Sequence, residues 1–516
     1  MRNPLPGGRR AQALLATAAL TVMSMGVTAP AQADLLDPVE SVVEGILGEP
    51  VPTGWLYDSS ATTMAEVRAA IGAPAMWARG YTGEGVGVAL IDTGVVPVEG
   101  LTSGNVRNGA DLSFDSLFDQ GRWFDGFGHG THLAGIIAGA DPAGLDPERF
   151  LGVAPDARLL NVKVGASDGG VDVSQVIAAI DWVVAHRNDD PANPIRVINL
   201  SYGTDGVQDF EVDPLTHAVQ NAWRAGIVVV VSGGNAGFGS PKLNNPAYDP
   251  HVIAVGAADV RGTAAITGDD TVPDFSSRGD ASRRVDVVAP GRSIVSLRDP
   301  GSYIDSVHPG ARVGERFFKG SGTSQAAAVV SGAVALLLEQ RPDLTPDQVK
   351  ALLRSTASPM PFADSAGRGA GEIDVAAAGL AATPDAVQSW PTSQGTGSLN
   401  AARGTQYVAD GGVELGSEWD IMAPWKADKW AADSTAGTAW VGGRWNNRDW
   451  TGDCWCGSSW AGPTWEGRQW NGTSWAGRQW NGRQWNGRQW NGRQWNGDGW
   501  VGRQWNGRQW NGGNWS

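Results

Sequence analysis

Two hydrophobic patterns alternate between residues 62 and 382. One consists of short, nearly continuous apolar runs rich in β-branched residues, which are typical of strands buried on both faces of a sheet. The other consists of longer amphipathic stretches, which predict helices. Their alternation predicts an α/β domain in which helices flank a parallel sheet. The strands are expected at Val86–Ile91, Leu160–Val164, Val197–Leu200, Ile227–Val231 and Val252–Val255.

The first 33 residues have the pattern of a signal peptide. Arginines stand near the start, residues 11–28 are apolar and small, and an A-x-A cleavage site ends at Ala33. An uncleaved anchor is the alternative, but the apolar run is short for a bilayer span. The pair Arg9-Arg10 leaves Sec and Tat export both open. No other stretch is long and apolar enough to cross a membrane, so we expect a secreted protein whose short acidic N-terminal segment is residues 34–61.

The composition changes in the C-terminal part. Residues 383–439 are rich in Ser, Thr, Gly and Ala with few aliphatics, and we interpret them as a linker. From Trp440 to Trp515 a tryptophan falls at every fifth position, sixteen in all, in a W-x-G-x-x register that becomes WNGRQ. Asn-Gly after Trp favours a tight turn in each unit. This low-complexity Trp/Gly tail, residues 440–516, is expected either to stack as a solenoid or to be disordered.

Charge and cysteine content narrow the classes of partner. The net charge of −15 argues against nucleic acid as a partner of the whole chain. The repeat differs from the rest of the chain in the sign of its net charge: it carries nine arginines against four acidic residues and is therefore basic. The only cysteines are Cys454 and Cys456, which excludes a disulfide scaffold and a four-cysteine zinc site. Two cysteines one residue apart bridge poorly, so free thiols and an intermolecular link both remain open.

Three short stretches place a reactive residue beside glycine. Asp92 ends the strand in VALIDTG, at the edge of the sheet where ligands gather in open parallel sheets. His129 stands where a helix begins, in GFGHGTHLAG, and Ser324 opens an apolar helix in GTSQAAA. A serine needs an adjacent base to become a nucleophile, and the base needs a carboxylate that orients it. We therefore expect Asp92 to orient His129 and His129 to activate Ser324.

Two further residues need an interpretation beside these. Asn235 lies in the Gly-rich turn SGGNAG after a buried strand, where its amide could donate to a developing oxyanion. A backbone N–H at the start of the Ser324 helix would be the second donor. His132 lies three residues after His129, and we interpret it as structural, with a metal pair as the alternative.

These stretches, together with VINLSYG, DFSSRG and VDVVAPG, resemble the subtilisin-like serine peptidase family over residues 62–382. The resemblance implies a subtilisin-like parallel sheet flanked by helices. It also implies Asp92, His129 and Ser324 as the triad and Asn235 as the oxyanion donor. The substrate main chain would pair beside the loop after Val164 and beside four further residues. These substrate-binding residues are Ser201, Tyr202, Gly203 and Gly234.

The chain also departs from the family pattern. Ala328 and Val329 stand where the family usually has Pro and His after the serine. Because Pro in the first turn mainly preorganises a helix, we expect intact chemistry. Residues 34–61 are too short for the folding-assisting prodomain of secreted members. Members often bind calcium, but no acidic cluster matches a calcium loop, so no metal ligand is assigned and no cofactor is required for the chemistry.

The sequence therefore predicts a secreted serine endopeptidase that acts on proteins or peptides. The alternative is a catalytically silent binding protein that adheres through its Trp-rich tail. Exposed indole faces stack on sugars, so the tail suggests a cell-wall polymer as partner, while a self-packed module is the competing interpretation. The tail has no histidine and only four scattered acidic residues, none placed for acid–base chemistry, so a chain ending near Ala382 is expected to fold and cleave soluble peptides.

Overall fold

The computed structural model describes residues 61–117, 121–143, 149–206, 208–237, 242–263, 267–410 and 413–449, with short pieces at 465–466, 495–497 and 510–512. The expected signal peptide and N-terminal segment lie outside these ranges, as do Cys454, Cys456 and most of the repeat. Within them, no helix is long and apolar enough to cross a membrane.

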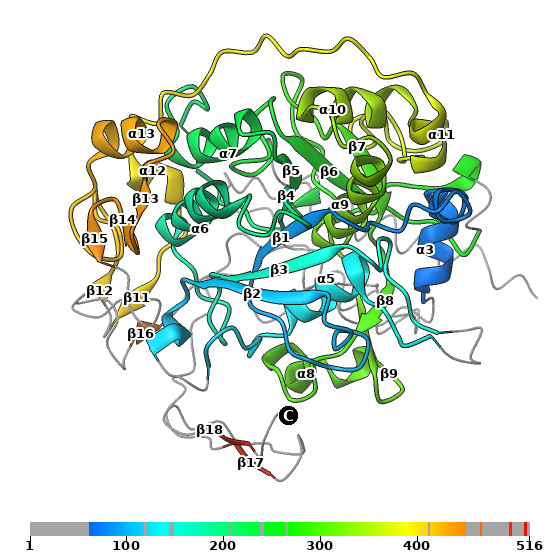
Figure 1. Ribbon diagram of the computed structural model, residues 1–516, viewed down its shortest axis with the longest axis horizontal. Helices are drawn as coiled ribbons and strands as arrows, with labels where there is room; N and C mark the ends of the chain where they lie inside the picture. The colour runs from blue at the N-terminus through cyan, green and yellow to red at the C-terminus, as the bar shows by residue number, and fades with distance from the viewer. Residues whose placement is uncertain are drawn as a thin grey trace, which may run out of the picture. The chain divides into compact units, whose positions relative to one another are not determined.

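The centre of the described region is a seven-stranded parallel sheet in the order β2-β3-β1-β4-β5-β6-β7 (Figure 1). β1 lies between β3 and β4 and is buried along its whole length, as its continuous apolar sequence predicts. The expected parallel sheet is confirmed. The strands are β1 (Gly87–Asp92), β2 (Val106–Asp111), β3 (Arg158–Lys163), β4 (Ile195–Leu200), β5 (Val228–Ser232), β6 (Ile253–Ala258) and β7 (Val287–Pro290).

β2 and β7, the two edge strands, were not among the strands expected from the hydrophobic pattern. β2 has the sequence VRNGAD and exposes much of its length, so it carries no apolar signal. β7 is a buried run of four residues that ends in Pro290. A smaller antiparallel sheet lies apart from the main one and contains β8 (Ile294–Leu297), β9 (Arg312–Val313) and β10 (Phe317–Gly320).

Helices cover the sheet. α9 is apolar on nearly every side and packs against α5 and five of the strands, which explains its burial. α6 and α7 pack against each other, and α6 begins with a capping box between Asp172 and Gln175. The helices are α3 (Met64–Ala70), α4 (Ala73–Trp77), α5 (His129–Ala138), α6 (Val173–His186), α7 (Pro214–Arg224), α8 (Tyr303–Val307), α9 (Thr323–Gln340), α10 (Pro346–Ser355) and α11 (Val375–Leu380).

The range interpreted as a linker contains folded structure. An extended stretch leaves α11 and crosses the top of the view in Figure 1 to α12 (Leu399–Arg403) and α13 (Ala427–Thr435). α13 packs against α7, and Trp430 and Arg403 are fully buried. The low aliphatic content hid this structure, because the segment buries tryptophan and arginine instead. Short strands β11 (Ala409–Asp410) and β12 (Val413–Glu414) lie between the two helices.

The first units of the repeat form a small antiparallel meander. Its strands are β13 (Trp440–Val441), β14 (Arg444–Trp445) and β15 (Arg448–Asp449). Gly442-Gly443 and Asn446-Asn447 form the turns, and all four have positive φ, as a tight primed turn requires. Neither turn has the Asn-Gly sequence on which the expectation rests. The Trp-Asn-Gly units that the structure describes, Trp495–Gly497 and Trp510–Gly512, are instead the strands β17 and β18, which pair in parallel, so the turn expected at Asn-Gly is not found there.

Candidate active site

The carboxyl ends of three neighbouring strands supply the predicted chemistry. Asp92 is the last residue of β1, Ser201 directly follows β4, and Asn235 lies three residues beyond β5. Ends of parallel strands meet at one edge of a sheet, so these residues share that edge. The N-termini of α5 and α9, which pack against each other, bring His129 and Ser324 to the adjoining helix layer.

Asp92 and His129 form a direct pair. His129 Nδ1 lies 2.7 Å from Asp92 Oδ1, and both side chains are buried. The N–H of Thr93 also donates to Asp92 Oδ1 at 2.8 Å, which fixes the carboxylate. A carboxylate accepts the Nδ1 proton, so the lone pair of the imidazole is on Nε2. This is the tautomer that a general base needs.

Burial dominates the electrostatics of this pair. It raises the pKa of Asp92 well above its usual range, while hydrogen bonds from Thr93 act in the opposite direction. Burial also lowers the pKa of His129 well below its usual range, and the nearby Asp125 carboxylate raises it in part. A neutral imidazole at neutral pH is ready to accept a proton.

Asp125 is a site residue that the sequence analysis missed. Its two carboxylate oxygens accept from the backbone N–H groups of Gly128 and Thr131, both at 2.7 Å, and from Thr93 Oγ1 at 2.7 Å. It therefore caps the helix that begins with His129 and links that helix to Thr93 beside Asp92. The available signal was an aspartate three residues before Gly128, the N-cap of α5. Because glycine follows Asp125, this aspartate resembles an ordinary turn residue in the sequence.

Ser324 is the second residue of α9 and is buried. Its Oγ has no hydrogen-bond partner among the residues that the structure describes. The Ser324 carbonyl accepts from Ser201 Oγ at 3.2 Å, so the residue that follows β4 contacts the first turn of α9. A position at a helix N-terminus places the Ser324 backbone N–H among the unpaired donors of the first turn.

Asn235 is held beside the serine through Thr323. The Thr323 N–H and Oγ1 both donate to Asn235 Oδ1, at 2.8 and 2.9 Å. A backbone N–H only donates, so the atom that it meets is the amide oxygen. The Asn235 amide NH₂ is consequently turned away from Thr323 and is available to donate elsewhere. This orientation suits a donor to an oxyanion.

His132 has a structural environment. It is buried, and its Nε2 lies 3.1 Å from the carbonyl of Phe318. Burial lowers the pKa of His132 to about 3. In the described ranges no group of three or more His, Cys, Asp or Glu side chains could hold a metal ion.

Of the residues expected to bind substrate, Ser201 and Gly234 contact the start of α9. Tyr202 is buried, with 2% of its surface exposed. A side chain on Gly203 would collide with Asn244, because a Cβ there would lie 2.8 Å from the Asn244 Cβ. The Gly234 N–H donates to Thr323 Oγ1 at 3.2 Å, which joins this turn to the start of α9.

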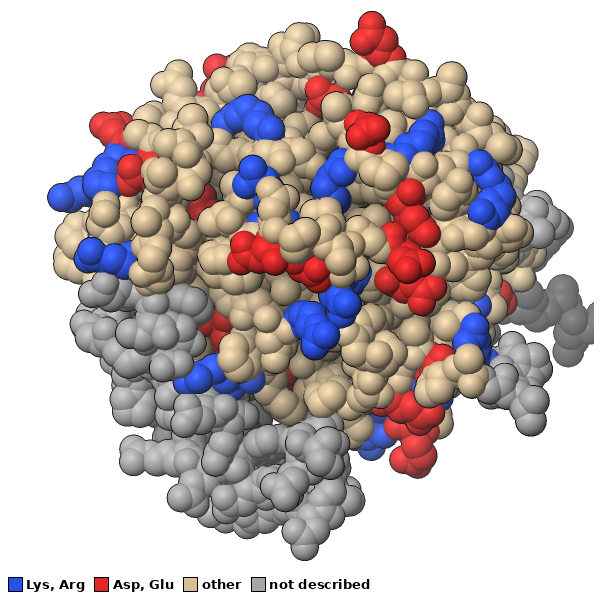
Figure 2. All heavy atoms as spheres, in the orientation of Figure 1, with Lys and Arg blue, Asp and Glu red and all other residues tan. Residues whose placement is uncertain are grey.

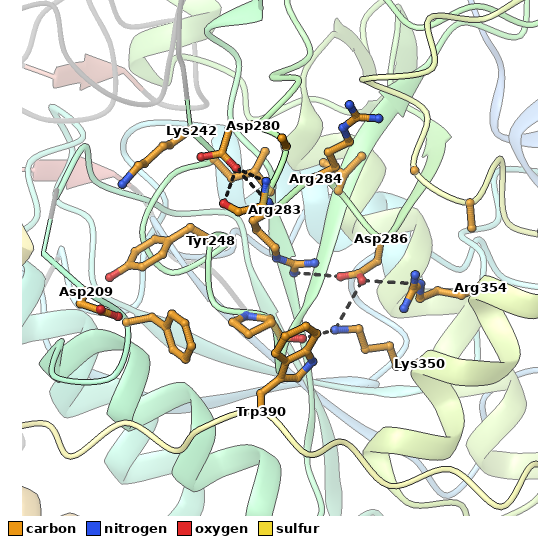
Figure 3. A pocket seen from close by; sticks show the side chains of 18 of the residues that line it. Asp209, Lys242, Tyr248, Asp280, Arg283, Arg284, Asp286, Lys350, Arg354 and Trp390 are labelled. Carbon is orange, nitrogen blue, oxygen red and sulfur yellow. Dashed lines mark hydrogen bonds and ion pairs between the residues drawn. The ribbon is translucent and has the colours of Figure 1, made fainter.

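A cavity of about 850 Å³ lies elsewhere and contains none of the triad residues (Figure 3). Its basic groups converge on Asp286, which Arg283 Nη2 meets at 2.9 Å and Lys350 Nζ at 3.4 Å. Trp390, from the extended stretch after α11, lines its rim. The lining contains Lys242, Arg283, Arg284, Lys350 and Arg354 against Asp209, Asp280 and Asp286, so the cavity is basic overall.

Comparison with known proteins identifies the family. Residues 83–397 match the subtilase family. The chain is 41% identical over 300 residues to serine protease AprX of Bacillus subtilis, an alignment that covers 57% of this chain and 66% of that relative. It is 34% identical over 303 residues to subtilisin DY of Bacillus licheniformis, covering 58% of this chain and 93% of that protein. With the fold and the Asp92–His129 pair, these matches show that the chain belongs to the subtilase family of serine-type endopeptidases.

Proposed function

We propose that this protein hydrolyses peptide bonds with Ser324 as nucleophile, His129 as general base and Asp92 as the orienting carboxylate. The observation that carries the proposal is the 2.7 Å contact between His129 Nδ1 and Asp92 Oδ1 in a buried site. It leaves Nε2 with the lone pair that the serine proton requires. The family match supports the reaction class.

The reaction proceeds in two halves. Ser324 Oγ attacks the peptide carbonyl carbon while His129 Nε2 takes the hydroxyl proton. The carbonyl oxygen becomes an oxyanion, to which the Asn235 amide and the Ser324 backbone N–H donate. The carbon–nitrogen bond then breaks as His129 gives its proton to the leaving amine. Water, deprotonated by His129, attacks the acyl-enzyme, and the released Ser324 takes the proton back.

Labelling with a fluorophosphonate tests the nucleophile directly. The full chain should incorporate the probe at Ser324, and Ser324→Ala should incorporate none. Ser324→Ala and His129→Ala should each lower kcat by about 10⁶-fold, the scale established for subtilisin itself. His132→Gln is the control: it removes a histidine outside the proposed triad, so labelling at Ser324 should be retained. A folded protein that neither labels nor cleaves would favour the catalytically silent binding protein.

We further propose that the protein is exported and that its Trp-rich tail, residues 440–516, binds polymers. Export follows from the charged, apolar and A-x-A pattern of the first 33 residues. Many indole faces and arginines on a repetitive tail suit weak contacts that add on a cell-wall polymer. On the face shown in Figure 2 acidic and basic side chains are interspersed, and the larger single-sign groups are acidic. That face therefore offers no continuous basic surface to a nucleic acid.

A comparison of chains tests the tail. The full chain should sediment with insoluble cell-wall material, whereas a chain ending at Asp449 should remain in the supernatant. Both should cleave a soluble peptide at the same rate. Equal sedimentation of the two chains would refute polymer binding by the tail without affecting the proposed peptidase.

A further inference from the structure

A segment downstream of the catalytic helices runs along one of the loops that the proposed function assigns to substrate. We call residues 394–405 the brace. Its N-terminal half follows residues 208–213: the Gln394 N–H donates to the Glu211 carbonyl and the Gly397 N–H to the Val212 carbonyl, each at 2.7 Å. Gln208 Nε2 donates to the Ser398 carbonyl, also at 2.7 Å. Two backbone bonds and one side-chain bond therefore hold this half of the brace beside the loop.

The C-terminal half of the brace reaches the residues just after Ser201-Tyr202-Gly203. Thr204 Oγ1 donates to the Ala402 carbonyl at 2.5 Å, and the Thr405 N–H donates to Asp205 Oδ1 at 2.7 Å. The fit is close, because a Cβ on Gly206 would lie 2.7 Å from the Ala402 carbonyl oxygen. The loop after β4 is therefore held on one side by residues that lie about two hundred positions later in the chain.

Arg403 joins the brace to the second substrate loop. Its Nε donates to Asp172 Oδ2 at 2.6 Å and its Nη2 to Asp172 Oδ1 at 3.3 Å. Both side chains are fully buried. Asp172 ends the loop after β3, residues 165–172, and caps α6 by accepting from the Ser174 N–H at 2.9 Å. A bidentate buried pair of this kind fixes orientation as well as distance.

Arg403 is itself locked in place from the other side. Its Nη1 donates to the Ser417 carbonyl at 2.9 Å, and its Nη2 donates to the Trp419 carbonyl. The guanidinium therefore links the loop at 165–172, the brace and residues 417–419 in a single hydrogen-bonded group. Removal of the guanidinium would leave the Asp172 carboxylate buried without its cation, which forces the loop end to rearrange.

We propose that Arg403 is a positioning residue for substrate binding. Together with the rest of the brace, it holds the loop 165–172 and the loop 201–213 at the separation that an extended peptide needs. This inference rests on the proposed function, because these are the loops between which the substrate main chain would pair. The proposal gives Arg403 no role in the triad, because Arg403 acts on the loop 165–172 through its bonds to Asp172.

Arg403→Ala in the full chain tests the proposal. For peptides long enough to fill several subsites, KM should rise about tenfold as the loops lose their fixed separation. The rate of labelling by a small fluorophosphonate, which needs only the triad and oxyanion donors, should stay within twofold of the parent. Arg403→Lys should recover part of the loss, because one ammonium reaches Asp172 without the second bond.

Arg448→Ala is the matched control. Arg448 bonds to Asp420 and to the Pro424 carbonyl, within the C-terminal segment and away from both loops. It should lower the melting temperature without changing KM. Equal KM values for folded Arg403→Ala and the parent would overturn the proposal, as would an equal KM effect of Arg448→Ala.

A milder variant tests the brace if Arg403→Ala does not fold. Thr405→Val removes only the side-chain bond to Asp205 Oδ2, a pair that is exposed at the surface. It should raise the KM of long peptides more than that of a minimal ester substrate; equal effects on both would overturn the brace. Failure of the proposed function looks different, because then the parent itself would not label at Ser324.

Discussion

The indole N–H of Trp445 donates to Asp181 Oδ2 at 3.0 Å, so the second tryptophan of the repeat is fastened to helix α6. Trp430 donates to the same oxygen at 2.8 Å, and Ser434 Oγ donates to Oδ1 at 2.6 Å. One buried carboxylate thus joins α13 and the start of the repeat to the catalytic domain. The boundary between domain and tail lies beyond Trp445, and the residues before it are part of the folded unit.

Asp181 makes the stability of this junction depend on pH. Burial among neutral donors raises its pKa to about 6. A carboxyl whose folded pKa exceeds its unfolded value of about 3.9 stabilises the fold below that unfolded value, and this contribution is lost as pH rises through about 6. The loss by pH 7 is about 3 kcal/mol. We expect Asp181→Asn to be more stable than the parent at pH 7 and to have no such advantage at pH 4.

Asparagine fits this site because its oxygen can accept from both indoles while its NH₂ donates to the Ser434 hydroxyl. Chemical denaturation of both proteins across pH 4 to 7 measures the difference. Asp385→Asn is the control, since Asp385 is an exposed carboxylate outside this junction. A large loss of stability in Asp181→Asn at pH 7 would contradict the argument.

Chain length should separate folding from polymer binding. A chain ending at Asp449 keeps Trp430, Trp445 and Arg403, and we expect the full melting temperature and full activity on soluble peptides. A chain ending at Ala382 loses all three buried side chains. Removing one buried tryptophan costs about 3–5 kcal/mol, so this shorter chain should be strongly destabilised. That outcome is the opposite of what composition alone suggested for Ala382. Equal melting temperatures of the two chains would show that the C-terminal segment contributes little.

Asn235→Ala should act on the rate of reaction and leave substrate binding largely unchanged. It removes one donor to the oxyanion, which develops in the transition state and is absent from the bound substrate. kcat should fall by about 10² to 10³-fold with little change in KM. Steady-state kinetics on a chromogenic peptide measures both. Asn244→Ala is a useful comparison, because Asn244 lies beside Gly203 and Gly234 and should act on KM. A raised KM with normal kcat in Asn235→Ala would refute the oxyanion role.

Asp125→Asn should move the acid limb of the pH profile. The Asp125 carboxylate raises the pKa of His129, so its neutralisation should lower that pKa. Activity is lost as pH falls through the pKa of the base, so kcat/KM should then be lost at a lower pH. One backbone donor near the start of α5 also loses its acceptor, which should cost about 1–3 kcal/mol of stability. Asp141→Asn, a carboxylate paired with Arg316, is the control and should leave the profile unchanged.

Local sequence was enough to predict five of the seven strands of the main sheet, and it gave the chain order of the reactive residues. β1 and β5 are nearly continuous apolar runs; Asp92 is the last residue of β1, and Asn235 stands in a glycine-rich turn after β5. The link from Arg403 to Asp172 could not be predicted, because its partners are 231 residues apart and neither stands in a periodic pattern. Asp125 was missed for another reason, since a helix cap and a turn aspartate look alike until the helix is placed.

The partners of Asp181 also set an order in time for the folding of the chain. Trp445 follows Asp181 by 264 residues, so the site on α6 stays open until almost the whole described chain has emerged. Contacts of such long sequence separation form late and slowly. Asp92, His129 and Ser324 are all synthesised well before Trp445 can bond to Asp181. Completion of the peptidase therefore waits for a segment that contributes nothing to its chemistry.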